Sequence, residues 1–502
     1  ETGARIRDRL KAKKNSKTRK AHFEIRDKRG REGNFPALLF CTGLQPCHKA
    51  GMIRHALAAT ALLAATPLAA QSTTQDELDA RYDHALAAGY KALFICSALS
   101  GDAARSDTSV EDYELAGIQE PLNAIVPELT HSISRGSDGG LNYVAVPWDD
   151  DMSPRVAAYR QGKGCALLPI GAALPDSEVV RSTRIDRVGD PNVYPLRDAI
   201  APATTRAAEA ALGEDYGEGT LTTAVMVRQD DRTRGEAYAQ GYDADLPQRT
   251  WSVAKSLAAT LIGAAVQRGE ADVAASAGLG LDDSDPRRAI TIDHLLRMAS
   301  GRYSDTPGNR TDPLYFGGAT VGEVALDWPL LNPPGKIYRY ANNDTLAAVK
   351  AIEETFEKHP PAGLFETLGM HSTVAETDWQ GDYILSSQVW TSSADLARFG
   401  QLYLDDGMRN GTRILPEGWV EYVSTPSGPQ PDGPFGYGAG FWLLNNSEGV
   451  PADTFAAMGN RGQFVVIVPS MNTVIVRRGE DPPGARFDIA AFTRDVLVSL
   501  RN

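Results

Sequence analysis

A serine and a lysine one helical turn apart are the residues of this sequence best suited to chemistry. They are Ser252 and Lys255, at the head of the stretch Trp251–Gly269. A serine hydroxyl is a poor nucleophile until a base removes its proton. A lysine can be that base when burial, or the positive end of a helix dipole, lowers its pKa. The pair therefore indicates nucleophilic catalysis, although Ser-x-x-Lys also arises by chance on the order of once or twice in such a chain.

The apolar pattern after this pair predicts a helix. Val253, Leu257, Leu261 and Ala265 recur at every fourth position, and Gly269 is a normal helix stop. Backbone N–H groups at the start of such a helix can bind a developing oxyanion. The alternative is an ordinary helix with an N-terminal serine and an exposed lysine.

Two later segments could complete a site. Tyr340 and Asn342 follow a Pro-Pro-Gly turn, and in extended backbone positions i and i+2 point the same way. Glycines in the segment 457–463 let a substrate lie close to the backbone before the strand predicted at Phe464–Val468. Taken alone, each segment could equally be a surface turn or an ordinary loop.

The periodicity of the second half predicts strands and helices in a mixed order. The predicted strands are Thr222–Val227, Gly235–Tyr242, Phe464–Val468 and Thr473–Arg477, and the predicted helices are Asp198–Leu212, Ile290–Gly301, Leu396–Leu404 and Phe487–Leu500. Strands at both ends with helices between them predict one α+β domain, whose sheet joins the two ends of the chain segment.

Residues 71–195 form an accessory region of mixed structure whose role the sequence does not reveal. The region opens with a helical pattern, in which Ala92–Ile95 is a short apolar strand candidate. Tyr143–Val146 and Arg155–Tyr159 are also predicted strands.

The charge of the chain is unevenly distributed. Residues 1–51 contain 14 basic and 5 acidic residues, a net charge of +9, and Arg54 adds one more. Since the whole chain carries −13, residues 71–502 carry −23. An acidic body of this kind argues against nucleic acid or an anionic membrane as a partner.

Residues 52–70 have the layout of a signal peptide. A short basic start is followed by an apolar stretch and by Ala69 and Ala70, and no segment is long enough to span a membrane comfortably. We therefore expect an exported protein, periplasmic or secreted. Residues 1–51 are interpreted as a non-native upstream segment, and a genuine basic tail is the alternative.

The cysteines and histidines do not have the spacing of a metal site. Cys96 and Cys165 are the cysteines left after the predicted cleavage, and in an exported protein they are permitted to pair, with two buried thiols as the alternative. Five histidines follow residue 70, and none is spaced as a ligand pair. We expect no metal site.

Together these motifs resemble the serine β-lactamase and penicillin-binding superfamily, and its class C-like branch in particular. That branch includes D-alanyl-D-alanine carboxypeptidases, D-aminopeptidases, esterases and 6-aminohexanoate-dimer hydrolases. The resemblance covers about residues 195–502. Its marks are Trp-Ser-Val-Ala-Lys-Ser at 251–256, His-Leu-Leu-Arg-Met-Ala-Ser-Gly at 294–301, Pro-Gly-Lys-Ile-Tyr-Arg-Tyr-Ala-Asn at 334–342 and Gly-Asn-Arg-Gly-Gln at 459–463. It implies a β-lactamase/transpeptidase-like α+β fold over 196–502, with an antiparallel sheet flanked by helices and an all-helical subdomain.

The resemblance also implies roles for individual residues. Ser252 would be the acylated nucleophile and Lys255 its base partner, with Tyr340 as the proton relay and Asn342 as a donor to the acyl-side amide of the substrate. No cofactor is needed. The implied activity is that of an esterase or amidase similar to the 6-aminohexanoate-dimer hydrolases, acting on a small-molecule ester or linear amide substrate. The alternatives are a β-lactamase or D-alanyl-D-alanine carboxypeptidase, and a receptor that is acylated without turnover.

The segment 457–463 corresponds to the third motif of the superfamily, after the Ser252–Lys255 and Tyr340–Asn342 motifs, and its sequence departs from the usual pattern. An ungapped alignment puts Ala457, Met458 and Gly459 where Lys/His-Thr/Ser-Gly is usual, and makes the N–H of Asn460 the second oxyanion donor. The missing cation and hydroxyl usually hold a substrate carboxylate. This wall of the site is therefore expected to be apolar. Arg461 is the one nearby cation of the motif, and in an extended strand it should face the same side as Gly459 and Gln463 rather than Asn460. The alternative is that Arg461 swings into the site.

Overall fold

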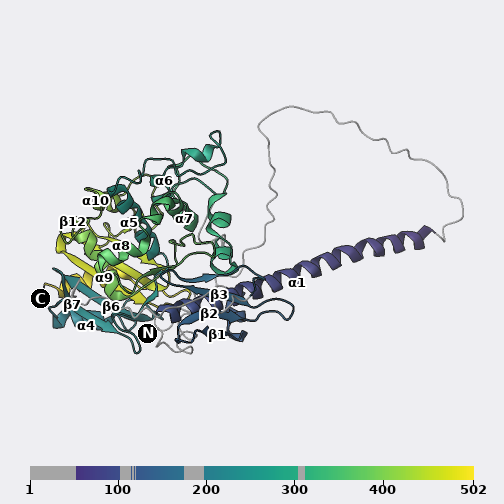
Figure 1. Cartoon of the computed structure of the whole chain (residues 1–502), viewed down its shortest axis with the longest axis horizontal. Coiled ribbons are helices and arrows are strands. Elements are labelled where there is room, and N and C mark those ends of the chain that lie inside the picture. The colour runs from purple at the N-terminus through teal and green to yellow at the C-terminus, as the bar shows by residue number, and fades with distance from the viewer. Residues whose placement is uncertain are drawn as a thin grey trace, which may run out of the picture. The chain divides into compact units, whose positions relative to one another are not determined.

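The computed structural model describes residues 53–101, 115, 118, 120–173, 197–303 and 311–501, with side chains from residue 74 onward. The chain divides into two compact units, Glu1–Gln71 and Ser72–Asn502. Of the first unit, only the backbone of the first part of helix α1, Ile53–Gly101, is described. All other described elements belong to the second unit (Figure 1).

The largest sheet of the second unit has eight strands in the order β13-β14-β15-β16-β17-β6-β7-β5. In that order they are Gly436–Tyr437, Trp442–Leu443, Phe455–Gly459, Gln463–Val468, Thr473–Gly479, Thr222–Gln229, Arg232–Tyr238 and Arg197–Asp198. The strands predicted at Phe464–Val468 and Thr473–Arg477 are confirmed and pair as the hairpin β16–β17. The strand predicted at Thr222–Val227 is also confirmed and pairs with β7, which begins at Arg232 rather than at the predicted Gly235. Strand β17 pairs with β6, so the sheet joins the two ends of the domain as predicted.

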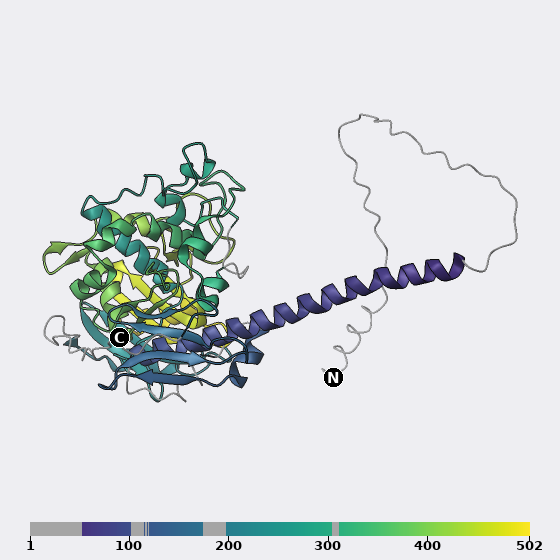
Figure 2. The same ribbon diagram turned by 45° about the vertical axis from the view of Figure 1, so that its right-hand side comes forward.

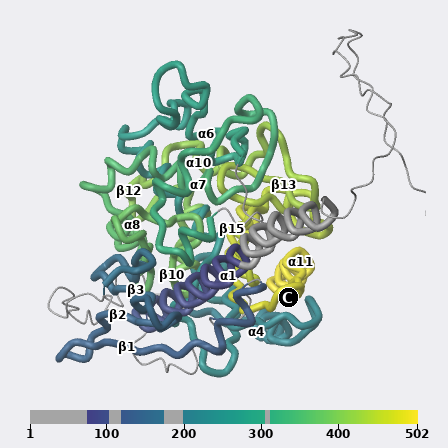
Figure 3. The backbone as a smooth tube through the Cα atoms, turned by 90° about the vertical axis from the view of Figure 1, so that its right-hand side faces the viewer, coloured from purple at the N-terminus to yellow at the C-terminus, as the bar shows by residue number. Residues whose placement is uncertain are grey.

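Helices cover both faces of this sheet. Helices α4 (Pro202–Ala210) and α11 (Ile489–Ser499) pack on each other and on one face, where they share a core with Val466 (Figure 3). Because neighbouring strand residues point to opposite faces, Val465 belongs to the other core. That core lies against α5 (Val253–Gln267) and α9 (Ser393–Leu404).

The remaining helices of residues 197–501 gather on the α5 side of the sheet (Figures 1 and 2). They are α6 (Ile292–Leu296), α7 (Asn342–Lys350), α8 (Pro361–Leu368) and α10 (Trp419–Ser424). The helix predicted over Ile290–Gly301 is wrong in its length. Thr291 caps it, and Met298 adopts a positive φ of 56°, which is incompatible with a continuing helix.

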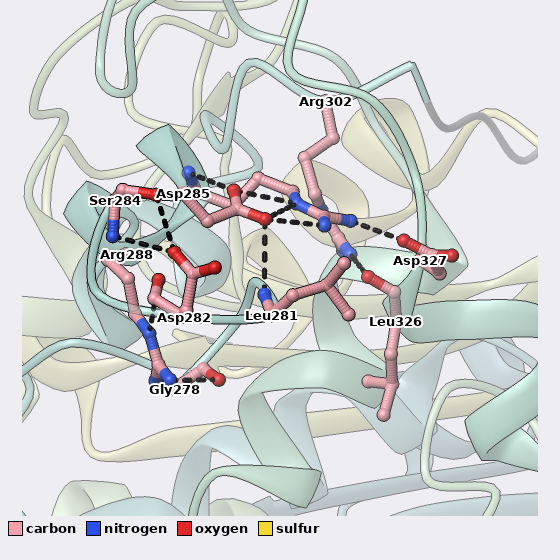
Figure 4. A network of polar contacts seen from close by, with 10 residues as sticks. Gly278, Leu281, Asp282, Ser284, Asp285, Arg288, Arg302, Leu326 and Asp327 are labelled. Atoms are coloured by element: carbon pink, nitrogen blue, oxygen red, sulfur yellow. Dashed lines mark hydrogen bonds and ion pairs between the residues drawn. The ribbon is translucent and has the colours of Figure 1, made fainter.

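A network of ion pairs fixes the connection between α5 and α7 (Figure 4). Arg287 bridges Asp285 and Asp327, and its hydrogen bonds hold the pKa of the Asp285 carboxyl well below its usual range. Arg302 and Asp344 form a buried ion pair with an Nη2–Oδ1 distance of 2.9 Å. Since Asp344 lies in the first turn of α7, this pair anchors the helix that carries Asn342.

The accessory region contains a four-stranded antiparallel sheet in the order β1-β2-β3-β4. Its strands are Ser132–Arg135, Leu141–Val146, Arg155–Arg160 and Gly164–Leu167, which confirms the two strands predicted there. The short helix α3 (Leu122–Ile125) precedes them. One hydrophobic core joins Phe94 and Val144 of this region to Tyr315 and Trp390, which lie beyond residue 196. The accessory region therefore packs as part of the second compact unit.

The strand predicted at Ala92–Ile95 is wrong, because these residues lie inside helix α1. Every residue from Ala85 to Leu99 is buried. A helix enclosed on all sides needs no polar face, so it lacks the amphipathic period that identifies a helix in a sequence.

Short sheets complete the second unit. Strands β8 (Gln248–Arg249), β10 (Val389–Thr391) and β9 (Val374–Ala375) form one sheet, and β11 (Met408–Arg409) and β12 (Thr412–Arg413) form another. Strand β8 ends three residues before Ser252, so this small sheet leads directly into the predicted nucleophile.

The predicted pairing of Cys96 and Cys165 is confirmed. The disulfide joins α1 to β4, with the two Cα atoms 6.0 Å apart. Within the described residues, no helix is long and apolar enough to cross a membrane.

Candidate active site

Helix α5 brings the serine and the lysine of the first motif together. Ser252 is the N-cap of the helix, and Lys255 follows in its first turn. The Lys255 Nζ atom lies 3.1 Å from the Ser252 Oγ atom. Lys255 is only 2% exposed, so the alternative of an exposed lysine is excluded.

Three oxygen atoms surround the Lys255 amine. Besides Ser252 Oγ, these are Asn342 Oδ1 at 2.6 Å and the Ser386 carbonyl oxygen at 2.8 Å. A neutral amine has two N–H donors and one lone pair. Because an amide oxygen and a carbonyl oxygen can only accept, they take the two N–H groups, and the lone pair is left to accept the proton of Ser252. Asn342 in turn donates from Nδ2 to Thr311 Oγ1 at 3.1 Å, which fixes the orientation of its amide.

The surroundings of Lys255 favour this neutral form. Burial, and to a lesser extent the positive charge of Arg249, together lower the pKa of Lys255 to about 7. A lysine that titrates near neutral pH can take a proton from serine and return it within one catalytic cycle. The structure thus supplies the burial that the sequence could only suggest.

Tyr340 lies beside the same amine. The Lys255 Nζ atom is 5.1 Å from the centre of the Tyr340 ring. The rings of Tyr437 and Trp442 pack against that ring, with centre-to-centre distances of 6.1 and 5.5 Å. Burial raises the pKa of Tyr340, while a hydrogen bond with Ser252 acts in the opposite direction. The phenol therefore stays protonated at neutral pH, a state suited to giving a proton to a leaving group.

The end of strand β15 passes close to the start of α5. A Cβ atom added to Gly459 would lie 3.1 Å from the Ser252 backbone nitrogen and 2.3 Å from the Thr250 carbonyl oxygen. Only glycine fits there, because any side chain would collide with the backbone. Asn460, the next residue, is exposed at the strand end. The structure thus places Gly459 of the third motif against the backbone of Thr250 and Ser252.

Arg461 does not occupy the extended position expected from the sequence. It has left-handed backbone angles, with φ 55° and ψ 28°, and its side chain is buried. Its Nη1 atom pairs with Glu480 Oε2 at 2.8 Å, and Nη2 donates to the Glu480 carbonyl. This ion pair holds Arg461 in the protein interior. The extended backbone expected at this position is therefore wrong, and the alternative in which Arg461 swings into the site is excluded.

The two residues before Gly459 also differ from expectation. Ala457 is fully buried in the core beneath α5, whereas Met458 faces the opposite core with α11. They are apolar, as their types require, but they do not form one shared wall, because neighbouring residues of a strand point to opposite faces.

Several residues near the site were not identified from the sequence. Ser386 contributes only a backbone carbonyl, and its Oγ atom lies 2.7 Å from the Tyr315 hydroxyl. Neither lies in a motif. Tyr437 and Trp442 could have been found, because they lie in a stretch rich in glycine and aromatic residues just before the third motif.

The fold and this arrangement define a serine hydrolase with a β-lactamase/transpeptidase-like fold. The family described as Beta-lactamase matches residues 205–498, more than half of the chain, and the chain belongs to this family. The fold predicted from the sequence is therefore confirmed.

Two relatives locate the chain within the family. It is 24% identical over 294 residues to the 6-aminohexanoate-dimer hydrolase of Paenarthrobacter ureafaciens, an overlap of 53% of this chain and 74% of that protein. A solved structure from Bacillus anthracis, named as a candidate 6-aminohexanoate-dimer hydrolase, matches with a TM-score of 0.50 at 21% identity. That match covers 61% of this chain and 86% of the other, and at this identity it supports the fold.

Proposed function

We propose that the protein hydrolyses an ester or a linear amide through an acyl-enzyme on Ser252. The observation that carries the proposal is the buried amine of Lys255, 3.1 Å from Ser252 Oγ, with its two N–H groups directed to Asn342 Oδ1 and the Ser386 carbonyl. The named activity of the relative, hydrolysis of the 6-aminohexanoate dimer, supports a linear amide as one substrate class.

In the acylation step, Ser252 attacks the substrate while Lys255 and Tyr340 transfer protons. Neutral Lys255 accepts the proton of Ser252 as Oγ attacks the carbonyl carbon of the substrate. The N–H groups of Ser252 and Asn460 donate to the oxyanion of the tetrahedral intermediate. As the intermediate collapses, Tyr340 gives its proton to the leaving oxygen or nitrogen and recovers one from Lys255.

Deacylation repeats the same proton movements with water. Water attacks the Ser252 ester and gives its proton to Lys255 through Tyr340, and the proton then returns to Ser252 Oγ as the acid product leaves. The enzyme ends in its starting state, and the bond cleaved overall is the ester or amide bond of the substrate.

We predict that a neutral substrate is hydrolysed faster than a matched one with a carboxylate near the scissile bond. Arg461 is held by Glu480, and position 457 carries no cation. A carboxylate that loses water without gaining a partner costs about 1–3 kcal/mol, which is roughly 5- to 150-fold in kcat/KM. The measurement compares 3-carbamoylphenyl acetate with 3-carboxyphenyl acetate, each corrected for its rate of alkaline hydrolysis.

The variant Glu480→Gln is matched to this comparison, because it keeps the shape of the side chain and removes the charge that holds Arg461. The difference in kcat/KM between the two esters should be smaller in the variant than in the wild type.

Faster hydrolysis of nitrocefin or a D-alanyl-D-alanine peptide than of every neutral ester or amide would contradict the proposal and favour the β-lactamase or carboxypeptidase alternative. A burst of one equivalent of product with no further turnover would favour the receptor.

We also propose that the protein is exported and that its mature form begins near Gln71. Residues 52–70 have a signal-peptide layout, and the second compact unit begins at Ser72. The disulfide between Cys96 and Cys165 belongs to an oxidising compartment. Intact-mass measurement of the periplasmic fraction should give a chain without residues 1–70. A mass that includes residues 1–51 would refute the proposal.

A further inference from the structure

A buried arginine lies between the accessory region and the nucleophile. Arg249 is 2% exposed. Its Cζ atom lies 4.4 Å from the ring centre of Phe94 on α1 and 3.7 Å from that of Trp251, the residue before Ser252. Trp251 has a positive φ of 50°, rare for an aromatic residue, so the backbone here is held by its surroundings.

The same guanidinium holds the segment that contacts the lysine. Arg249 donates from Nε to the Ser387 carbonyl at 3.3 Å and from Nη2 to Ser387 Oγ at 3.1 Å. The neighbouring carbonyl, that of Ser386, accepts the hydrogen bond of Lys255. One side chain therefore contacts both the residue before the nucleophile and the segment that orients the base.

We propose that Arg249 is a positioning residue for Lys255, and that the accessory region acts on the active site through the contact of Phe94 with Arg249. The inference deepens the proposed function, because it takes Lys255 as the base. It also assigns a function to the accessory region, which is to support Arg249. Phe94 covers one face of the guanidinium, and it lies in the helix that the disulfide fastens to β4.

The positive charge of Arg249 also acts on Lys255, because it favours the neutral form of the amine. The groups around the Lys255 amine are Ser252, Tyr340, Asn342 and Ser386, all neutral when Tyr340 is protonated, and Arg249 is the cation that contributes to its titration. A nearby cation disfavours the ammonium form and therefore lowers the pKa of the lysine. Removal of the positive charge of Arg249 should raise that pKa.

The test is an NMR titration of Lys255 in the full chain labelled with 13Cε-lysine, with the signal assigned by its loss in Lys255→Met. We expect a midpoint near pH 7 in the wild type and about one pH unit higher in Arg249→Gln. Arg249→Lys keeps the positive charge, so its Lys255 midpoint should lie closer to the wild-type value than to that of Arg249→Gln. Arg228→Gln is the matched control, because Arg228 is equally buried but contacts Asp231 and Thr233 instead.

A second variant tests the contribution of the accessory region. Phe94→Leu keeps an apolar side chain but removes the ring over Arg249, and we expect the rate of fluorophosphonate labelling at pH 8.5 to fall about threefold to tenfold. An unchanged Lys255 midpoint in Arg249→Gln, or wild-type labelling by Phe94→Leu at every pH, would overturn the inference. If the wild-type lysine titrates near pH 7 and responds to Arg249→Gln, but the protein never labels, the proposed function fails and the positioning role of Arg249 stands.

Discussion

Ser252→Ala is expected to lower kcat by at least about four orders of magnitude, because loss of a catalytic nucleophile leaves only binding and oxyanion stabilisation. The variant should also lose all covalent labelling by a fluorophosphonate probe. Ser252 is the N-cap of α5, but its side chain caps no backbone N–H, so the substitution should leave the fold intact. Steady-state kinetics on a neutral aryl ester and intact-mass detection of the adduct measure the two effects.

Ser256→Ala is the matched control, since Ser256 lies on the same helix one turn beyond the nucleophile. Its hydroxyl donates to the Gly440 carbonyl at 2.6 Å and does not contact Lys255. This variant should remain active and label fully. Stoichiometric labelling of Ser252→Ala would show that another residue is the nucleophile.

Lys255→Met is expected to have the second largest effect, a loss of about two to four orders of magnitude in kcat/KM at pH 8. Because burial lowers the pKa of Lys255 to about 7, the amine is protonated and inactive below this pH and neutral above it. The wild-type profile of kcat/KM against pH should therefore rise through a midpoint near 7 and then level. The same profile measured for Lys255→Met should lack this limb.

Lys255→Arg separates the role of the charge from the role of the base. Arginine keeps the cation and its donors towards Asn342 and Ser386, but its pKa above about 12 prevents it from becoming neutral. It should be as inactive as the methionine variant from pH 6 to 9. Substantial activity of Lys255→Arg would mean that Lys255 supports the site only as a charge.

The local sequence was sufficient for the features set by near neighbours in the chain. The hairpin β16–β17 and the helix after Ser252 follow from residue types whose period matches one element. Ser252 and Lys255 meet because residues three positions apart lie on the same face of a helix with 3.6 residues per turn. The resemblance, carried by the order and spacing of several motifs, identified the fold that the family match confirms.

Other features depended on contacts between distant segments. Helix α1 was missed at Ala92–Ile95 because burial on all sides removed its period, and burial is a property of the packed chain. Arg461 was misplaced because its position is set by Glu480 and by a left-handed turn.

The surroundings of Lys255 are the clearest case of a property that only the tertiary structure decides. Its second carbonyl partner comes from Ser386, 131 residues away, and the cation that lowers its pKa is stacked against Phe94 of another region. The sequence determined which groups could react. Because a pKa depends on burial and on charges brought near by folding, only the folded chain decided that the pKa of this lysine lies near neutral.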